Sequence, residues 1–114
     1  MKISTLIQSA LDAAALLSSD LNKGGDVDVT TFDKWTEALL RFGFYHTKQR
    51  THSQCIENLH RELLLIVKNN PSRAIEILEE YVAIVTEVRD AATDLNHSIE
   101  WEPPFDRGMV YDYT

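Results

Sequence analysis

Residues 71–100 read PSRAIEILEEYVAIVTEVRDAATDLNHSIE, the longest stretch of the chain with one continuous helical period. Its apolar side chains recur in steps of three and four residues, which is the spacing of one face of an α-helix. Three heptads of this pattern predict a helix that packs lengthwise against other helices, either in this chain or in a second copy in a homodimer. The residues of this stripe are Leu78, Tyr81, Val85, Val88, Ala92, Leu95 and Ile99.

Two segments of the N-terminal half share the helical period. The first is predicted to be helical over about 4–20 and to end at Gly24 and Gly25, because glycine readily takes the backbone conformations that close a helix. The second is predicted to begin near Thr31, with Thr30 or Thr31 as its N-cap. Apolar residues lie on more than one side of this second segment, which is typical of a helix in the centre of a core or one partly open to a partner.

A third helix is predicted between these segments and residue 71. It covers about 52–68, and Asn70 is expected to cap the following helix with Pro71 at its first position. The period of this third segment predicts a buried stripe made of Cys55, Leu59, Leu63 and Ile66.

The four segments together predict an all-α fold, a single four-helix bundle-like domain over residues 1–100. Residues 101–114 are predicted to form an extended tail, because two successive prolines cannot continue a helix. The tail is rich in aromatic side chains, which either pack back on the bundle or dock on a partner protein. The aromatic residues expected to contact a partner are Trp101, Phe105, Tyr111 and Tyr113.

Composition narrows the possible functions. The chain of 114 residues holds 11 Lys and Arg against 18 Asp and Glu, for a net charge of −7. We expect no direct binding to nucleic acids or to anionic membranes, because both attract basic surfaces. A single cysteine excludes a disulfide within the chain. No signal peptide or membrane span is evident, so a cytoplasmic protein is expected.

The negative charge is concentrated in the last predicted helix. Residues 73–100 hold seven acidic and two basic side chains, whereas residues 31–61 hold five basic and three acidic ones. The basic stretch either neutralises this acidic helix within the fold or leaves it available to a partner. Carboxylates along a long helix can imitate the phosphate spacing of a duplex. The candidate contact residues on this helix are Glu76, Glu79, Glu80, Glu87, Asp90 and Asp94.

This pattern favours a small, acidic, non-enzymatic binding protein. It would occupy a basic or nucleic-acid-binding surface of a partner protein, because a negative helix face complements a positive one. Small inhibitors, immunity proteins, antitoxins and phage or mobile-element accessory proteins share this kind of composition. The alternative interpretation of the same residues is an ordinary solvated helix face.

The connection between the first two predicted helices gives a second hypothesis. Residues 20–31, DLNKGGDVDVTT, resemble the twelve-residue calcium loop of the EF-hand family, with a glycine at the sixth position and an aliphatic residue at the eighth. The resemblance implies Ca²⁺ as a ligand of an EF-hand-like module. The family's oxygen ligands are replaced at the fifth position by Gly24 and at the twelfth by Thr31. The remaining candidate metal ligands are Asp20, Asn22, Asp26 and Asp28.

Residues 20–31 also have an interpretation without calcium binding, and a different pair of residues suggests a third function. Residues 20–31 also fit a polar, glycine-ended connection in which an Asp caps the next helix. Separately, Arg41 and His46 are five residues apart, which resembles the Arg-x4-6-His signature of HEPN-type ribonucleases. That resemblance implies a ribonuclease in which Arg41 and His46 act at the scissile phosphate of RNA.

Overall fold

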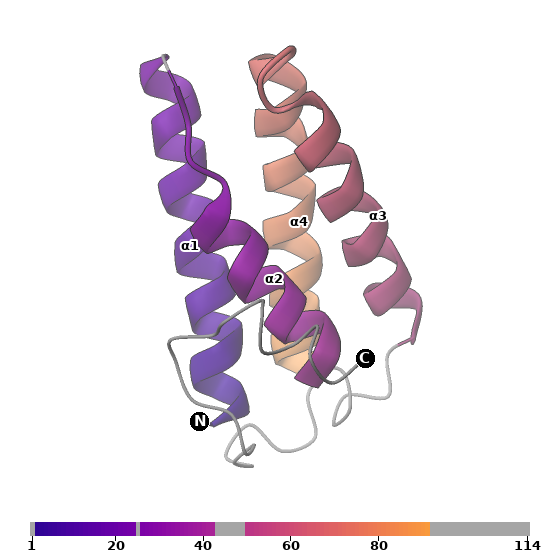
Figure 1. The fold of residues 1–114 in the computed structure, drawn as a ribbon. Coiled ribbons are helices and arrows are strands. Elements are labelled where there is room, and N and C mark those ends of the chain that lie inside the picture. The colour runs from indigo at the N-terminus through magenta and orange to yellow at the C-terminus, as the bar shows by residue number, and fades with distance from the viewer. Residues whose placement is uncertain (1, 25, 43–49, 92–114) are drawn as a thin grey trace, which may run out of the picture.

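The protein is an all-α, four-helix bundle-like domain (Figure 1). The computed structural model describes residues 2–24, 26–42 and 50–91. Consecutive helices run in opposite directions along the bundle (Figure 1). The predicted tail, 101–114, and the predicted last turns of the fourth helix lie outside the described residues. The four helices are α1 (Ile3–Lys23), α2 (Thr30–Phe42), α3 (Arg50–Ile66) and α4 (Pro71–Ala91).

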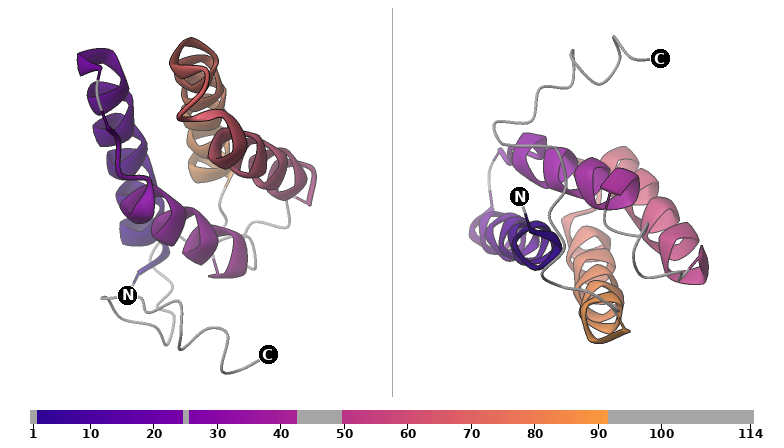
Figure 2. Two further views of the ribbon diagram at one scale, coloured as in Figure 1. Left: turned by 45° about the horizontal axis from the view of Figure 1, so that its top comes forward. Right: turned by 90° about the horizontal axis from the view of Figure 1, so that it is seen from below.

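The bundle consists of two helical hairpins joined through α1 and α4. The first hairpin pairs α1 with α2, the second pairs α3 with α4, and the hairpins meet where α1 packs on α4. The end-on view in Figure 2 shows α1 beside both α2 and α4, with α3 on the far side of α4. Helices α2 and α3 share much less contact than the other neighbouring pairs. Side chains that bridge α2 and α3 are therefore important for holding these two helices together.

The apolar stripe of α4 is buried inside the chain's own bundle. Leu78, Tyr81, Val85 and Val88 are at most 1% exposed, and Ala74 and Ile77 extend the same face. Their neighbours in the core come from all three other helices. The described part of the predicted stripe thus packs against helices of this chain.

The buried face of α3 differs by one helical row from the predicted stripe. Leu59 and Leu63 are buried as expected, but Cys55 is only partly buried, and Ile56 is fully buried instead. At the other end Val67 is buried and Ile66 only packs against the edge of the core. The reason is that α3 faces α2 as well as α4, so the centre of its buried surface rotates toward α2.

Local signals end and start the helices largely where the sequence predicts. Gly24 follows α1 with φ 75° and ψ 165°, a conformation that L side chains rarely adopt, and its N–H donates to Leu21 O. Asn70 caps α4, because its Oδ1 accepts from the Arg73 N–H at 3.2 Å, directly before Pro71 in the first position.

The cap of α2 is Asp28, so the predicted threonine cap is wrong. Its Oδ1 accepts from the Thr30 backbone N–H at 2.9 Å, and Thr30 is already the first helical residue. Hydrogen bonds from the side chain and backbone of Thr30 lower the pKa of Asp28. The aspartate takes the cap because its carboxylate reaches the free N–H groups of the first turn and favours the positive end of the helix.

Candidate functional site

Five carboxylates of α4 form one exposed strip, called the acidic face here. Its residues recur at helical spacing on the side of α4 opposite the buried stripe, and they span about 21 Å at 1.5 Å per residue. The predicted Asp94 and the aromatic residues Trp101, Phe105, Tyr111 and Tyr113 lie outside the described residues. The acidic face comprises Glu76, Glu79, Glu80, Glu87 and Asp90.

Three members of the acidic face have partners within the chain. Arg73 bridges Glu76 of its own helix and Glu62 of α3, each at 3.2 Å. Asp90 pairs with the adjacent Arg89 at 3.4 Å. These pairs are exposed or only partly buried, so each contributes little to stability. A basic partner could therefore replace them at little cost.

The third partnered carboxylate is Glu87, whose Oε2 lies 3.0 Å from Nε2 of His52 on α3. This contact is the one link between the basic stretch, 31–61, and the acidic face among the described side chains. The other ring nitrogen of His52, Nδ1, is buried and has no hydrogen-bond partner in the described part of the chain. His52 is thus held between the two helices of the second hairpin.

Glu79 and Glu80 stand apart from the rest of the acidic face. Both are exposed, and neither forms an ion pair or hydrogen bond with any residue that the structure describes. Arg73 attracts Glu80 electrostatically, but no direct ion pair occupies either carboxylate, so both remain accessible to an approaching cation. Arg61 of the basic stretch is not their partner, since it pairs with Glu57 of its own helix at 2.9 Å.

Sequence reasoning missed a group of polar side chains inside the core, called the polar cluster here. Nε2 of His60 on α3 lies 2.7 Å from Oδ1 of Asp33 on α2, and both residues are less than 10% exposed. The Thr36 and Tyr81 hydroxyls lie 2.7 Å apart and join α2 to α4. The ring of Phe32 packs edge-on against both His60 and Tyr81. The polar cluster consists of Asp33, Thr36, His60 and Tyr81.

The sequence did not predict that part of the basic stretch, 31–61, is buried. Asp33 and His60 both belong to this stretch, and the structure buries them against each other. The available signal was the three-residue step from Asp33 to Thr36, which places both on the face of α2 that carries Phe32 and Leu39. Polar residues on an apolar face can be buried when they find partners, and only the fold supplies those partners.

Burial of His60 predicts that acid destabilises the protein. Burial, aided by the Arg61 charge and opposed by Glu57, lowers the pKa of His60 below its ordinary 6.5. The unfolded chain therefore takes up a proton that the folded chain resists, so the free energy of unfolding should fall as the pH decreases between about 7 and 5. Urea unfolding at several pH values measures this. His60→Gln should show a flatter slope, and a wild-type stability that rises in acid would contradict the prediction.

The structure does not gather the four candidate calcium ligands into one site. Asp20 and Asn22 belong to the last turn of α1, and Asn22 donates from Nδ2 to Ser18 O at 3.0 Å. Asp28 caps α2 and lines, with Asp20, a hollow between α1 and α2. Asp26 lines a different groove. Among the described residues, no three His, Cys, Asp or Glu side chains come together as a metal site.

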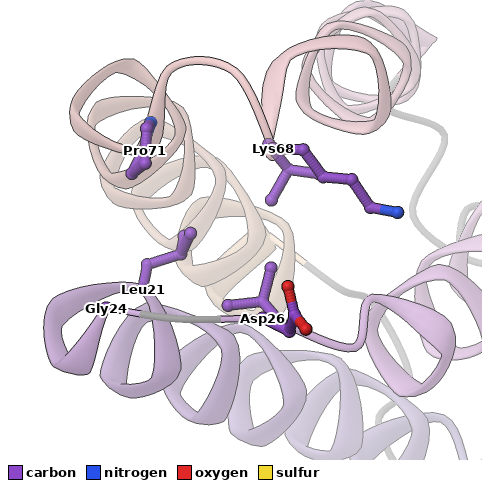
Figure 3. Close-up of a pocket in the computed structure, with 7 residues that line it drawn as sticks. Leu21, Gly24, Asp26, Lys68 and Pro71 are labelled. Carbon is purple, nitrogen blue, oxygen red and sulfur yellow. The ribbon is translucent and has the colours of Figure 1, made fainter.

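The groove beside Asp26 lies at the end of the bundle where the two hairpin connections meet (Figure 3). It has a volume of about 430 Å³. Figure 3 shows Asp26 on one wall and Lys68 on the opposite wall. The cap at Asp28 and the turn at Gly24 support the alternative interpretation of residues 20–31 as a capped, glycine-ended connection. The lining residues are Leu21, Gly24, Asp26, Val27, Val67, Lys68 and Pro71.

The described residues contain half of the pair that resembles the HEPN signature. Arg41 is exposed in the last turn of α2, whereas His46 lies outside the described residues.

Within the described ranges, no helix combines the length and the apolar character that crossing a bilayer requires. In comparisons with known proteins, the chain matches no protein-family model, no curated protein and no solved structure.

Proposed function

We propose that this chain is a non-enzymatic binding protein that uses the acidic face of α4 to occupy a basic surface of a partner protein. The observation that carries the proposal is the state of Glu79 and Glu80, which are exposed and unpaired among the described residues. Inhibitors, immunity proteins, antitoxins and accessory proteins that cover nucleic-acid-binding surfaces are the functional class that this arrangement suits best.

The separation of a buried apolar stripe from an exposed acidic face on α4 supports this proposal. The apolar stripe of the helix, Leu78, Tyr81, Val85 and Val88, is buried within the bundle, so core packing does not involve the acidic face. The net charge of −7 adds long-range attraction toward a cationic surface and speeds association. A partner with Lys or Arg residues spaced along about 21 Å would complement the acidic face.

Charge reversal at three positions tests the proposal. Glu79→Lys, Glu80→Lys and Glu87→Lys combined should abolish capture of the partner, because the variant presents like charge to a basic surface. The measurement is affinity capture from the native host followed by mass spectrometry of the bound proteins.

A matched control carries the same change of charge on other surfaces. Asp12→Lys, Asp20→Lys and Glu57→Lys replace exposed carboxylates of α1 and α3, and this variant should retain the partner. Thermal unfolding of both triple variants checks that they are folded. Equal capture by the acidic-face variant and the wild type would reject the proposal.

A further inference from the structure

A shallow apolar groove runs beside the acidic face, between α1 and α4. Its volume is about 290 Å³. The α1 wall is made of small side chains, and the α4 wall includes Val82, which is 37% exposed. Glu79, one of the two unpaired carboxylates, forms part of the rim. The groove is lined by Ala14, Ala15, Ser18, Leu78, Glu79 and Val82.

We infer that this groove binds an amphipathic helix of the partner, with apolar residues on one face and Lys or Arg beside them. The inference rests on the proposed function and deepens it by naming the structural class of the basic partner. The apolar face of the incoming helix would cover Val82 and Ala15, while its cations would meet Glu79 and the neighbouring acidic face.

The shape of the groove fits a helix. Two antiparallel helices form its walls, and ridges of a third helix pack into such a furrow when the side chains at its base are small. Ala14, Ala15 and Ser18 supply these small side chains on one wall. Covering Val82 would also remove one of the few large apolar side chains that the described bundle leaves exposed.

Charge decides between a foreign helix and the chain itself. A second copy would bring another net charge of −7 and a second acidic face to the groove. Residues 92–114 hold five acidic side chains and one Arg, so their charge also has the sign of the rim. Like charges repel and oppose binding, whereas the acidic rim attracts a cationic helix. The foreign basic helix is therefore the occupant that the electrostatics favour.

A defined peptide tests the inference on the full-length protein. The probe is an 18-residue helical peptide with Leu and Ala along one face and Lys on the others, titrated by calorimetry. A scrambled peptide of the same composition keeps the charge but loses the apolar face. The amphipathic peptide should bind at least tenfold more tightly than the scrambled one, and amide NMR shifts should change at Ala14, Ser18 and Val82.

Neutral substitutions separate the groove from the charge. Val82→Gln combined with Ala15→Gln should weaken binding of the amphipathic peptide at least tenfold, because both place a polar amide on the docking surface. Leu65→Gln is the matched control, since Leu65 is 73% exposed on the outer face of α3 and should not matter. Unchanged binding by the Val82 and Ala15 variant, or equal binding of both peptides, would overturn the inference.

The acidic-face variant distinguishes failure of the groove inference from failure of the proposed function. If Glu79→Lys with Glu80→Lys abolishes binding while the groove variant binds normally, the groove inference fails and the proposed function stands. If neither variant changes binding, both fail. Sedimentation supplies a further check, because a dimer that Val82→Gln dissociates would identify a second copy as the occupant and overturn the inference.

Discussion

Replacing His60 with alanine should lower the free energy of unfolding by about 1–3 kcal/mol, which is the usual cost of removing one partner of a buried hydrogen bond. The substitution leaves the carboxyl of Asp33, which is 4% exposed, without the hydrogen bond from His60. It also removes the ring against which Phe32 packs. Because α2 and α3 share little other contact, losing the hydrogen bond between His60 and Asp33 weakens the helix pair with the least contact among the neighbouring pairs.

Urea unfolding at neutral pH measures this effect. His60→Gln is the matched control, since its amide can still donate to Asp33, and it should cost clearly less than His60→Ala. If the alanine variant is too unstable to study, a difference in unfolding midpoint between His60→Gln and the wild type still reports on the pair. A loss below about 1 kcal/mol for His60→Ala would show that the pair is not a determinant of stability.

Replacing Tyr81 with alanine should cost about 3–5 kcal/mol, as for other large buried rings. Tyr81 is fully buried in α4, and its ring lies 4.9 Å from that of Phe32 between their centroids. Its removal opens a cavity at the point where α2 and α4 meet. Burial also raises the pKa of the Tyr81 hydroxyl, so the group stays neutral throughout the working range.

Two conservative variants separate the ring from its hydroxyl. Tyr81→Phe leaves the Thr36 hydroxyl without its partner at 2.7 Å, and Thr36→Val does the reverse, so each should cost about 1–3 kcal/mol. The double variant replaces both polar groups by apolar ones and should cost less than the sum of the two. Equal costs for Tyr81→Phe and Tyr81→Ala would contradict a packing role for the ring.

The polar cluster and the acidic face should respond to mutation in opposite ways. Variants of His60 and Tyr81 are expected to change stability, because these residues are buried and contact other helices. Variants of Glu79 and Glu80 are expected to change binding with little effect on stability, because exposed carboxylates without partners in the described structure contribute little to folding. Measuring both properties on each variant tests the separation of the two sites.

Much of the fold could be predicted because it follows from local physics. The step of three and four residues along α4 specifies a helix and its buried side, and Asn70 with Pro71 marks where that helix begins. The buried row of α3 was harder to predict. Cys55 and Ile56 are adjacent, and a row through either residue satisfies the helical period. Which row faces the core depends on where α2 lies, and no local rule fixes that.

The candidate site divides in the same way. The sequence alone predicted a row of six carboxylates along the last helix, five of which belong to α4, because helical spacing determines which residues share a face. Only the tertiary structure decided that Glu79 and Glu80 remain unpaired among the described residues, that Glu87 meets His52, and that a groove opens beside Val82. It alone also brought Asp33 to His60, 27 residues apart, because partners that distant meet only once the helices have packed.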